Sequence, residues 1–355
     1  MLSPRAGTIL KSIVGQYIAN GMPVSSQSIT KDYELGVSPA TIRNEMARLE
    51  QEGYIIRPYP SAGSMPSDKG YRYYVETLTD IELPLAEQRL ISHLFHQVEK
   101  ELEEWLRLAA ALTARLVQNV AVVTMPKPVN CRFKRIELVA LQDSLALVVL
   151  VLYGARVKQQ LITFDQVITQ PELTATANKL NMAYSGLTRP QILAKATELS
   201  TTEQQVTDCL LKIMQSVDEQ EYEEPYLDGL HFMINQPEFA LSHRVLALME
   251  LIEQRNLLKA IIPPQLASHE VQIIIGKENK AEVIHDYSVV IRQYGLPDEA
   301  VGTISIVGPT RMPYARAIST VGYLSLVLST LVAELYGGKH PSAQAGVMPI
   351  DKGYR

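Results

Sequence analysis

The stretch SPATIRNEMARLE, residues 38–50, decides the fold of the N-terminal part of the chain. A serine followed by a proline is typical of a helix start, because serine caps free N–H groups and proline already has the φ of the first helical position. At 100° per residue, one arc of this helix carries only large apolar side chains. These are Ile42, Met46 and Leu49. The pattern predicts a helix from residue 39 to about residue 52 that buries this arc.

The opposite arc of the same helix is polar or small. It carries Ala40, Arg43, Asn44, Ala47 and Arg48, with Thr41 at its edge. In the major groove of DNA, arginine pairs with guanine and asparagine with adenine, and small residues let a helix approach the bases. The first turn, at Ser38, also points N–H groups outward, where a phosphate could bind. The alternative is an ordinary solvated helix face. The sequence of this helix alone does not decide between a DNA-binding face and a solvated one.

The flanking segments favour DNA binding. Apolar residues at helical spacing predict a first helix that stops near Asn20-Gly21, and Ser25 or Ser26 can cap a second helix. After residue 53 come a short strand signal at 54–56, a loop rich in Pro, Ser and Gly at 58–66, and a further helix. This is the order of elements in a winged helix-turn-helix, which we predict over residues 1–80. The candidate DNA-binding residues are Ser38, Ala40, Thr41, Arg43, Asn44, Arg48, Arg57, Ser61, Gly63, Ser64, Lys69 and Arg72.

Net charge limits how such a domain could bind. The chain has 33 Lys and Arg against 38 Asp and Glu, a formal charge of −5. The first 80 residues hold eight of each sign. A net neutral domain has no general attraction for a polyanion. Binding must therefore depend on where the cations are placed and on two copies acting together.

The rest of the chain alternates between helical and strand patterns. We expect one long helix over 85–118, strands between 120 and 166, helices from 170 to 260, strands again between 271 and 307, and a final helix through residues 318–335. This order predicts an α+β fold in which a mainly helical insert interrupts one domain. The expected domains are 1–80, then 81–165 together with 266–337, with the insert at 166–265 and a loose tail at 338–355.

Several functional classes have little support in the sequence. Cys131 and Cys209 are isolated, so neither a disulfide framework nor a cysteine metal pair is expected. His93 and His96 could share a helix face, but no third ligand of the right type is near, and we interpret them as surface residues. We find no catalytic set and no cofactor motif, and expect no enzyme. The longest apolar run, 145–153, is shorter than the ~18–20 residues that cross a bilayer, so we expect a soluble cytoplasmic protein with no membrane contact.

Specific motifs along nearly the whole chain point to one family. They are PVSS at 23–26, LGVSPATIRNEM at 35–46, SAG at 61–63, DKGYR at 68–72, YLDG at 226–229, NQPEF at 235–239, IGKEN at 275–279 and IVGPTRM at 306–312. Together they resemble the HrcA family of heat-inducible transcription repressors. One departure is Ser64-Met65, where the family usually has Arg-Ile. If that arginine reaches DNA, the wing of this chain lacks one charge-assisted phosphate contact.

The resemblance implies more than the residues show. The implied fold is a winged helix, a GAF-like α+β domain and a dimerising insert within it. The implied function is repression of chaperone operons by a homodimer, bound to an inverted-repeat operator of the CIRCE type, associated with the nucleoid and released on heat stress. A GroEL-type chaperonin is the implied protein partner. The alternative that stays open is a ligand-sensing, GAF-containing regulator of a different regulon, since fold analogy alone does not fix function.

Overall fold

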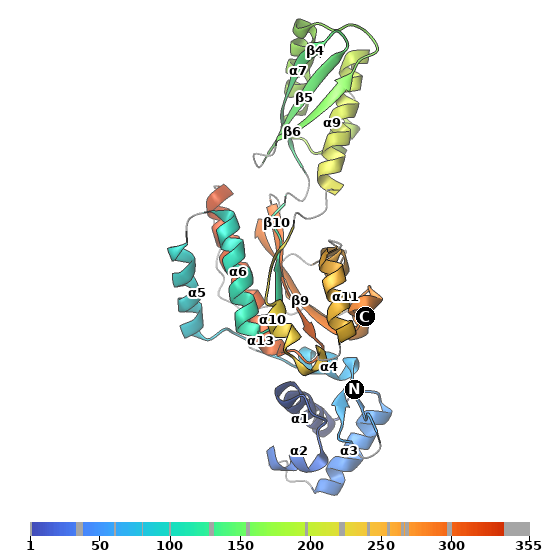
Figure 1. Ribbon diagram of the computed structural model, residues 1–355, viewed down its shortest axis with the longest axis vertical. Coiled ribbons are helices and arrows are strands. Elements are labelled where there is room, and N and C mark those ends of the chain that lie inside the picture. Colours follow the sequence, from blue (N-terminus) through green and yellow to red (C-terminus); the bar gives the residue numbers. More distant parts are fainter. Residues whose placement is uncertain are drawn as a thin grey trace. The chain divides into compact units, whose positions relative to one another are not determined.

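A computed structural model describes most of the chain. The described residues are 2–32, 38–59, 62–79, 81–98, 101–127, 131–153, 157–195, 198–219, 224–239, 242–253, 256–263, 266, 270–296 and 300–336. The candidate residue Ser61 and the expected tail at 338–355 lie outside them. The protein is a mixed α+β structure with two compact units (Figure 1). Unit 1 comprises residues 1–125, 223–295 and 302–355, and unit 2 comprises 126–222 and 296–301.

The N-terminal part of unit 1 has the order of elements expected from the sequence. The elements are α1 (Pro4–Asn20), α2 (Ser26–Asp32), α3 (Pro39–Gln51), β1 (Ile55–Ile56), β2 (Met65–Pro66) and α4 (Asp68–Glu76). α1 ends at Gly21, whose positive φ of 67° lets its N–H bond to the carbonyl of Tyr17. β1 and β2 pair antiparallel. The buried side chains of α1, among them Ile9 and Ile13, form a common core with those of α3.

A five-stranded sheet forms the body of unit 1. In spatial order it contains β7 (Tyr226–Asp228), β3 (Val120–Val123), β10 (Ala300–Pro309), β9 (Tyr287–Leu296) and β8 (Gln272–Ile275). β3 pairs antiparallel with both β10 and β7, and all four of its residues are completely buried. The continuous Val and Ala run of β3 is what a central strand requires, because both of its faces are covered. β7 is a strand that the sequence patterns did not reveal.

Three helices lie beside this sheet. They are α5 (Leu85–Gln97), α6 (Leu102–Val117) and α13 (Tyr314–Tyr336). α6 packs between the sheet and α5, and it contacts β3, β7 and α13. α13 is long and apolar enough to cross a membrane by length and composition. However, it packs as a core helix, since Ile318, Val321 and Leu324 are completely buried.

The expectation of one long helix over 85–118 is wrong. α5 ends at Gln97, and Val98 has the extended dihedral angles φ −84° and ψ 146°. α6 begins after Glu101, which is also extended. The apolar stripe continues through both helices because both bury residues in the same core, such as Phe95 on α5 and Trp105 on α6. Helical spacing therefore did not reveal the break.

Short elements complete unit 1 beside the sheet. They are α10 (Leu230–Ile234), α11 (Ser242–Glu253), α12 (Leu257–Ile261) and the 3-10 turns η1 (Pro237–Phe239), η2 (Gly276–Glu278) and η3 (Glu282–Ile284). η1 is anchored by Phe239, whose ring stacks on that of Tyr287 with a centroid separation of 5.4 Å. This brings Glu238 close to the N-terminal helices.

Unit 2 has a three-stranded sheet and three helices. The antiparallel sheet has the order β4 (Phe133–Gln142), β5 (Leu145–Leu152), β6 (Val157–Thr163). The helices are α7 (Gln170–Tyr184), α8 (Arg189–Ala194) and α9 (Thr201–Glu219). Alternate side chains of β5, such as Val148 and Leu150, form a core with those of α7 and α9. Asn181 on α7 binds both the N–H and the carbonyl of Ile136, at 2.8 and 3.0 Å.

The boundaries of the two units differ from the expected domain boundaries. Strands β4 to β6 were expected with the first strand, β3, but they belong to unit 2. Residues 223–265 were expected in the insert, but belong to unit 1. The physical reason is pairing: β7 bonds to β3, whereas the apolar face of β4 to β6 is buried by α7 and α9.

Candidate nucleic-acid interface

α3 begins and ends as its sequence dictates. Ser38 is extended, with φ −69° and ψ 153°, and its Oγ accepts the N–H of Thr41 at 3.2 Å. Pro39 fills the first helical position. At the other end, Gly53 has a φ of 76° and donates its N–H to the carbonyl of Glu50. Both ends are therefore fixed by local hydrogen bonds, which gives the helix a defined length.

The two faces of α3 are divided as predicted. Ile42 and Leu49 are completely buried and Met46 is nearly so. The exposed residues of the other face are Ser38, Ala40, Arg43, Asn44, Ala47 and Arg48, whereas Thr41 is half-buried. The structure thus presents a guanidinium and a carboxamide, separated by small side chains, on one open helix face.

The charged groups of this face differ in their partners. The Nε of Arg43 lies 3.4 Å from the Oγ of Ser26, the first residue of α2, which is a long hydrogen bond. Arg48 forms an ion pair with Glu52 at 2.8 Å, and this hydrogen bond raises the pKa of Arg48 above its ordinary value. An exposed pair one helical turn apart contributes little to stability and is readily exchanged. Arg43 is therefore the better placed of the two arginines for a base.

The wing is fixed at its base. The backbones of Val24 and Ser64 exchange two hydrogen bonds of 2.8 Å, which joins the returning strand to the loop before α2. A Cβ on Gly63 would lie 2.6 Å from the Pro23 carbonyl, so this glycine permits a close backbone approach. Ser64 is completely buried. We therefore correct the prediction for Ser64, which is not placed to contact a phosphate. Gly63 is half-buried and holds the wing close to Pro23, and its contact with DNA stays a prediction.

Three further cations were predicted to contact DNA, namely Arg57, Lys69 and Arg72. Arg57, after β1, is a third exposed and pairs with Glu50 at 3.2 Å. Lys69 is exposed, but its Nζ donates to the Glu52 carbonyl at 2.8 Å and lies 4.2 Å from the ring centroid of Tyr54. It thereby satisfies the carboxyl end of α3.

Arg72 faces away from this surface. Its guanidinium donates to both carboxylate oxygens of Glu278 and to the Ile273 carbonyl at 2.6 Å. Its side chain is only 17% exposed. The prediction that Arg72 contacts DNA is therefore corrected: this arginine joins α4 to the body of unit 1. The sequence showed a cation beside the wing but gave no sign of its partner, which lies 206 residues away.

Known proteins are similar in sequence to this chain over most of its length. The family model "HrcA protein C terminal domain" matches residues 103–318. A heat-inducible transcription repressor HrcA from Dehalococcoides mccartyi is 58% identical over 337 residues, which cover 95% of this chain and 98% of the relative. The chain belongs to the HrcA family. A second relative with the same description, from Roseiflexus castenholzii, is 41% identical over 95% of this chain and 96% of its own length.

A solved structure shares the fold of this HrcA-family chain. It is described as a hypothetical protein, covers 94% of this chain and 98% of its own, and gives a TM-score of 0.56 at 23% sequence identity. This likeness concerns the fold alone. The family members are described as transcription repressors and not as enzymes.

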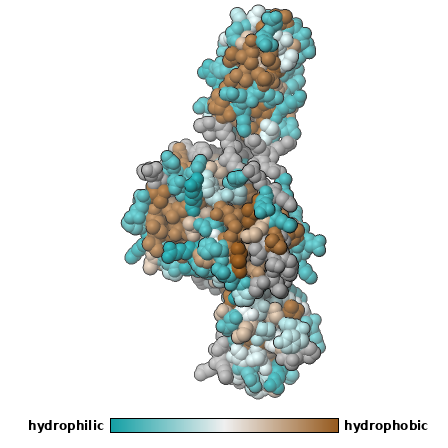
Figure 2. Space-filling view, viewed as in Figure 1, coloured by the Kyte–Doolittle hydropathy of each residue, from teal (hydrophilic) through white to brown (hydrophobic). Residues whose placement is uncertain are grey.

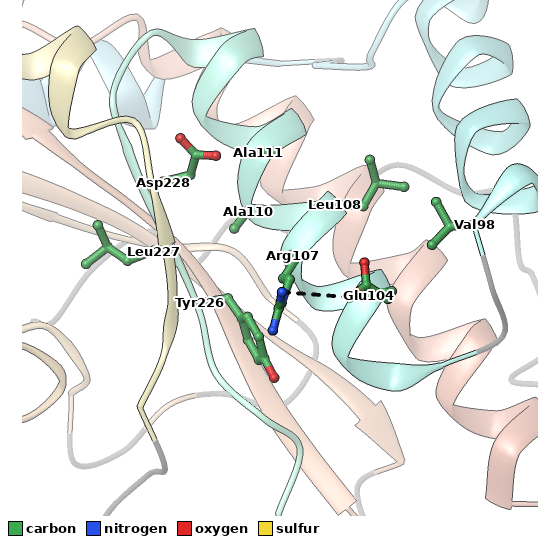
Figure 3. A pocket seen from close by; sticks show the side chains of 9 residues that line it. All are labelled: Val98, Glu104, Arg107, Leu108, Ala110, Ala111, Tyr226, Leu227 and Asp228. Carbon is green, nitrogen blue, oxygen red and sulfur yellow. Dashed lines mark ion pairs between the residues drawn. The ribbon is translucent and has the colours of Figure 1, made fainter.

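Other candidate sites lie in unit 1. A cavity of about 540 Å³ has a wall of apolar residues, including Ile261 and Ile273, with Lys259, Lys280 and Arg72 also lining it. A second one, of about 460 Å³, lies between α6 and β7. Figure 3 shows Arg107 there, in an ion pair with Glu104 and beside the ring of Tyr226. The guanidinium carbon of Arg107 lies 6.0 Å from the centroid of that ring.

Metal ligands do not cluster in the described parts of this HrcA-family chain. No group of three or more His, Cys, Asp or Glu side chains in them could hold a metal ion. His93 lies 2.9 Å from the amide of Gln97, and Nδ1 of His96 lies 2.7 Å from the Ser92 carbonyl. Both histidines therefore have partners on their own helix.

Proposed function

We propose that residues 1–80 form a winged helix-turn-helix that binds operator DNA and represses heat-inducible genes. The observation that carries the proposal is the open face of α3, with Arg43 and Asn44 exposed between small residues. In the major groove, Arg43 would read a guanine and Asn44 an adenine. The capped N-terminus of α3 at Ser38 and the wing cation Arg57 would bind phosphates on either side.

A second copy of the chain is the expected partner, through unit 2. The outer face of the β4–β6 sheet carries exposed apolar side chains beside the Arg135–Glu137 ion pair, whereas its inner face is packed on helices. Figure 2 shows hydrophobic residues gathered over this sheet. Val139, Leu147 and Leu161 form one row across the three strands, and Val139 and Leu161 are 44% and 56% exposed. A patch of this kind is typical of an interface, and a twofold axis would let the same face pack on itself.

Dimerisation explains how a neutral domain binds specifically. Two copies related by a twofold axis present two α3 helices to two half-sites, so the operator is an inverted repeat, of the CIRCE type known for the family. The bound dimer blocks transcription. A GroEL-type chaperonin keeps the repressor active, and heat, which occupies the chaperonin, releases the operon. The protein then acts in the cytoplasm, at the nucleoid.

A gel shift on two promoter fragments tests the proposal. One carries the inverted repeat, and the other has the same base composition with the repeat scrambled. We expect the purified chain to bind the repeat about a thousandfold more tightly, the lower range of specific over non-specific binding. Equal affinity for both fragments at the same salt concentration would overturn the proposal. Leu161→Lys tests the dimer separately: it should give monomers in sedimentation and weaken binding to the repeat.

A ligand-sensing role has one observation in its favour. The cavity of about 540 Å³ beside α4 has the size and apolar lining of small-molecule sites. A thermal-shift screen of metabolites would separate this role from direct heat regulation. A ligand that raises Tm and also changes operator affinity would support sensing. Failure of every compound to change either quantity would leave chaperonin and temperature as the controls.

A further inference from the structure

Four of the sequence motifs that identify the family lie outside the α3 face that we propose to contact the bases of DNA. They are residues 68–72, 275–279, 235–239 and 306–312. In the structure they meet in pairs, where the N-terminal helices pack on the body of unit 1. We call this set of contacts the junction. It consists of Asp68 and Arg72 on α4, Gly276 to Glu278 on η2, and Ile18, Glu238 and Arg311 around the end of α1.

The first contact of the junction is a two-pronged ion pair. Nε and Nη2 of Arg72 donate to the two carboxylate oxygens of Glu278. The Glu278 carboxylate is itself held, since it also accepts the N–H of Ile275 at 2.8 Å. A planar guanidinium bound by two parallel hydrogen bonds fixes orientation as well as distance. Arg72 therefore sets the angle at which α4 meets the body.

The second contact lies one helical turn away on α4. A carboxylate oxygen of Asp68 accepts the backbone N–H of Lys277 at 3.0 Å. The neighbouring Gly276 has a φ of 54°, and a Cβ there would lie 2.4 Å from Asp68 Oδ2. Only glycine fits both the backbone conformation and this approach. The turn at η2 is thus shaped to receive Asp68.

The third contact holds a different helix. Arg311 donates to the Ile18 carbonyl near the end of α1 at 2.8 Å, and to Glu238, with one hydrogen bond at 3.2 Å. The hydrogen bond to Glu238 raises the pKa of Arg311, whose side chain is 15% exposed. Attachment through both α1 and α4 opposes rotation of the N-terminal helices about either one.

We propose that Asp68, Arg72 and Arg311 are positioning residues that fix the direction of α3 relative to the body of unit 1, and thereby narrow the range of half-site spacings that the dimer accepts. The proposal rests on the DNA-binding function proposed above. Without the junction, the N-terminal helices would be held to the body only by the chain segment after α4 and by apolar contacts, such as that of the Tyr71 ring with the Tyr314 ring, which do not fix direction as paired hydrogen bonds do. Each half-site could then be bound, but the direction of each recognition helix relative to the body of its own unit 1 would no longer be fixed. Fixing them in advance lowers the entropy cost of binding both half-sites.

The spacing between half-sites is a sensitive readout. Each inserted base pair moves one half-site by about 3.4 Å and turns it by roughly 35° about the helix axis. A rigid pair of recognition helices should reject such a change, and a loosely attached pair should tolerate it. None of the junction residues has to touch DNA for this effect.

The experiment compares Glu278→Gln with Glu282→Gln, a nearby exposed glutamate on η3. Both full-length dimers are titrated with the inverted repeat, with repeats lengthened or shortened by one and two base pairs, and with a single half-site. For the unchanged chain and Glu282→Gln, we expect at least about tenfold preference for one spacing, in line with the usual coupling between linked sites. For Glu278→Gln, the preference should fall to about twofold, with the single half-site bound equally well. Unchanged spacing preference, or tighter binding to the best spacing, would overturn the proposal.

A second measurement needs no DNA and separates this proposal from the proposed function. Spin labels are placed at Gln51→Cys on α3 and Leu326→Cys on α13, both exposed, after the buried Cys131 and Cys209 are replaced by alanine. The distance distribution should be narrow in this background and broad when Glu278→Gln is added. A narrow distribution in both would contradict the junction's role even if the protein binds its operator. A broad distribution only with Glu278→Gln, in a protein that binds no specific DNA, would reject the function and retain the junction.

Discussion

Arg43 and Arg72 lie in the same N-terminal region, each within a motif that suggests DNA binding, but the structure gives them opposite surroundings. Arg43 is exposed, and its side chain forms a 3.4 Å hydrogen bond to Ser26. Arg72 is mostly buried and makes charge-assisted hydrogen bonds to Glu278. The sequence shows the same residue type in the same predicted domain in both cases. The number of partners within the protein is what separates a group that is available to DNA from one that holds the fold together.

The largest effect should follow from removing the buried member of this comparison. Arg72→Ala removes the guanidinium donor from the Ile273 carbonyl and from the Glu278 carboxylate, which keeps only the N–H of Ile275 among the described hydrogen bonds. We expect the free energy of unfolding to fall by about 2 kcal/mol, less than for a fully buried pair because Glu278 is 38% exposed. Urea unfolding at pH 7 measures it, with Arg5→Ala on α1 as a control for loss of an exposed charge. A loss below about 0.5 kcal/mol, no more than a surface change, would contradict the assignment.

Substitution of the exposed arginine, Arg43, should affect DNA binding and not stability. Arg43→Ala should leave the free energy of unfolding unchanged and weaken binding to the inverted repeat by about 1–3 kcal/mol, the usual cost of a lost bidentate base contact. Binding to scrambled DNA should change less. Competition gel shifts with both duplexes measure the difference, and Arg5→Ala again removes the same charge elsewhere. Equal weakening on both duplexes would mean that Arg43 binds a phosphate and reads no base.

How far the sequence predicts the molecule follows from the same contrast. The faces of α3 could be predicted because burial of Ile42 and exposure of Asn44 follow from helical periodicity within one short segment. The end of α1 at Gly21 and the cap at Ser38 are also local. The partner of Arg72 is not local, and no periodicity connects positions 72 and 278. The expected domain boundaries differ from the two units for the same reason. β3 pairs with β7 over a separation of about a hundred residues, which no local pattern shows.

Lys69 is intermediate between the two arginines in its exposure and its contacts. Its substitution should therefore have a smaller effect than either of the two changes above. It is exposed like Arg43, but its Nζ donates to the carbonyl of Glu52 at the end of α3. Lys69→Met should lower the free energy of unfolding by about 0.5–1 kcal/mol, the usual contribution of a cation at a helix carboxyl end. The dependence of operator affinity on salt should keep its slope. A slope smaller by about one would instead show that Lys69 binds a phosphate. Lys280→Met, at an exposed lysine far from α3, is the control.

The smallest effect at neutral pH concerns Tyr71, which lies on α4 next to Arg72. Its ring is 5.8 Å from that of Tyr314, and among the described residues its buried hydroxyl has no hydrogen-bond partner. Tyr71→Phe should therefore leave the free energy of unfolding at pH 7 unchanged, or raise it by less than about 1 kcal/mol. Such a result would show that the junction depends on its ion pairs and not on this phenol.

The same substitution gives a larger effect at alkaline pH. Burial raises the pKa of Tyr71 well above the ordinary value of 10.0. The unfolded chain therefore releases this proton near pH 10 while the folded protein keeps it, so the stability present below that pH is lost as the pH rises. Each such group lowers the free energy of unfolding by up to about 1.4 kcal/mol per pH unit. Between pH 10 and 11, Tyr71→Phe should make the decline in urea-unfolding free energy shallower than in the unchanged chain. Tyr59→Phe, at a tyrosine that is 60% exposed, should not change that decline. Parallel declines for all three proteins would mean that the Tyr71 hydroxyl reaches solvent, and that this side of α4 is more open than the buried contacts of Arg72 require.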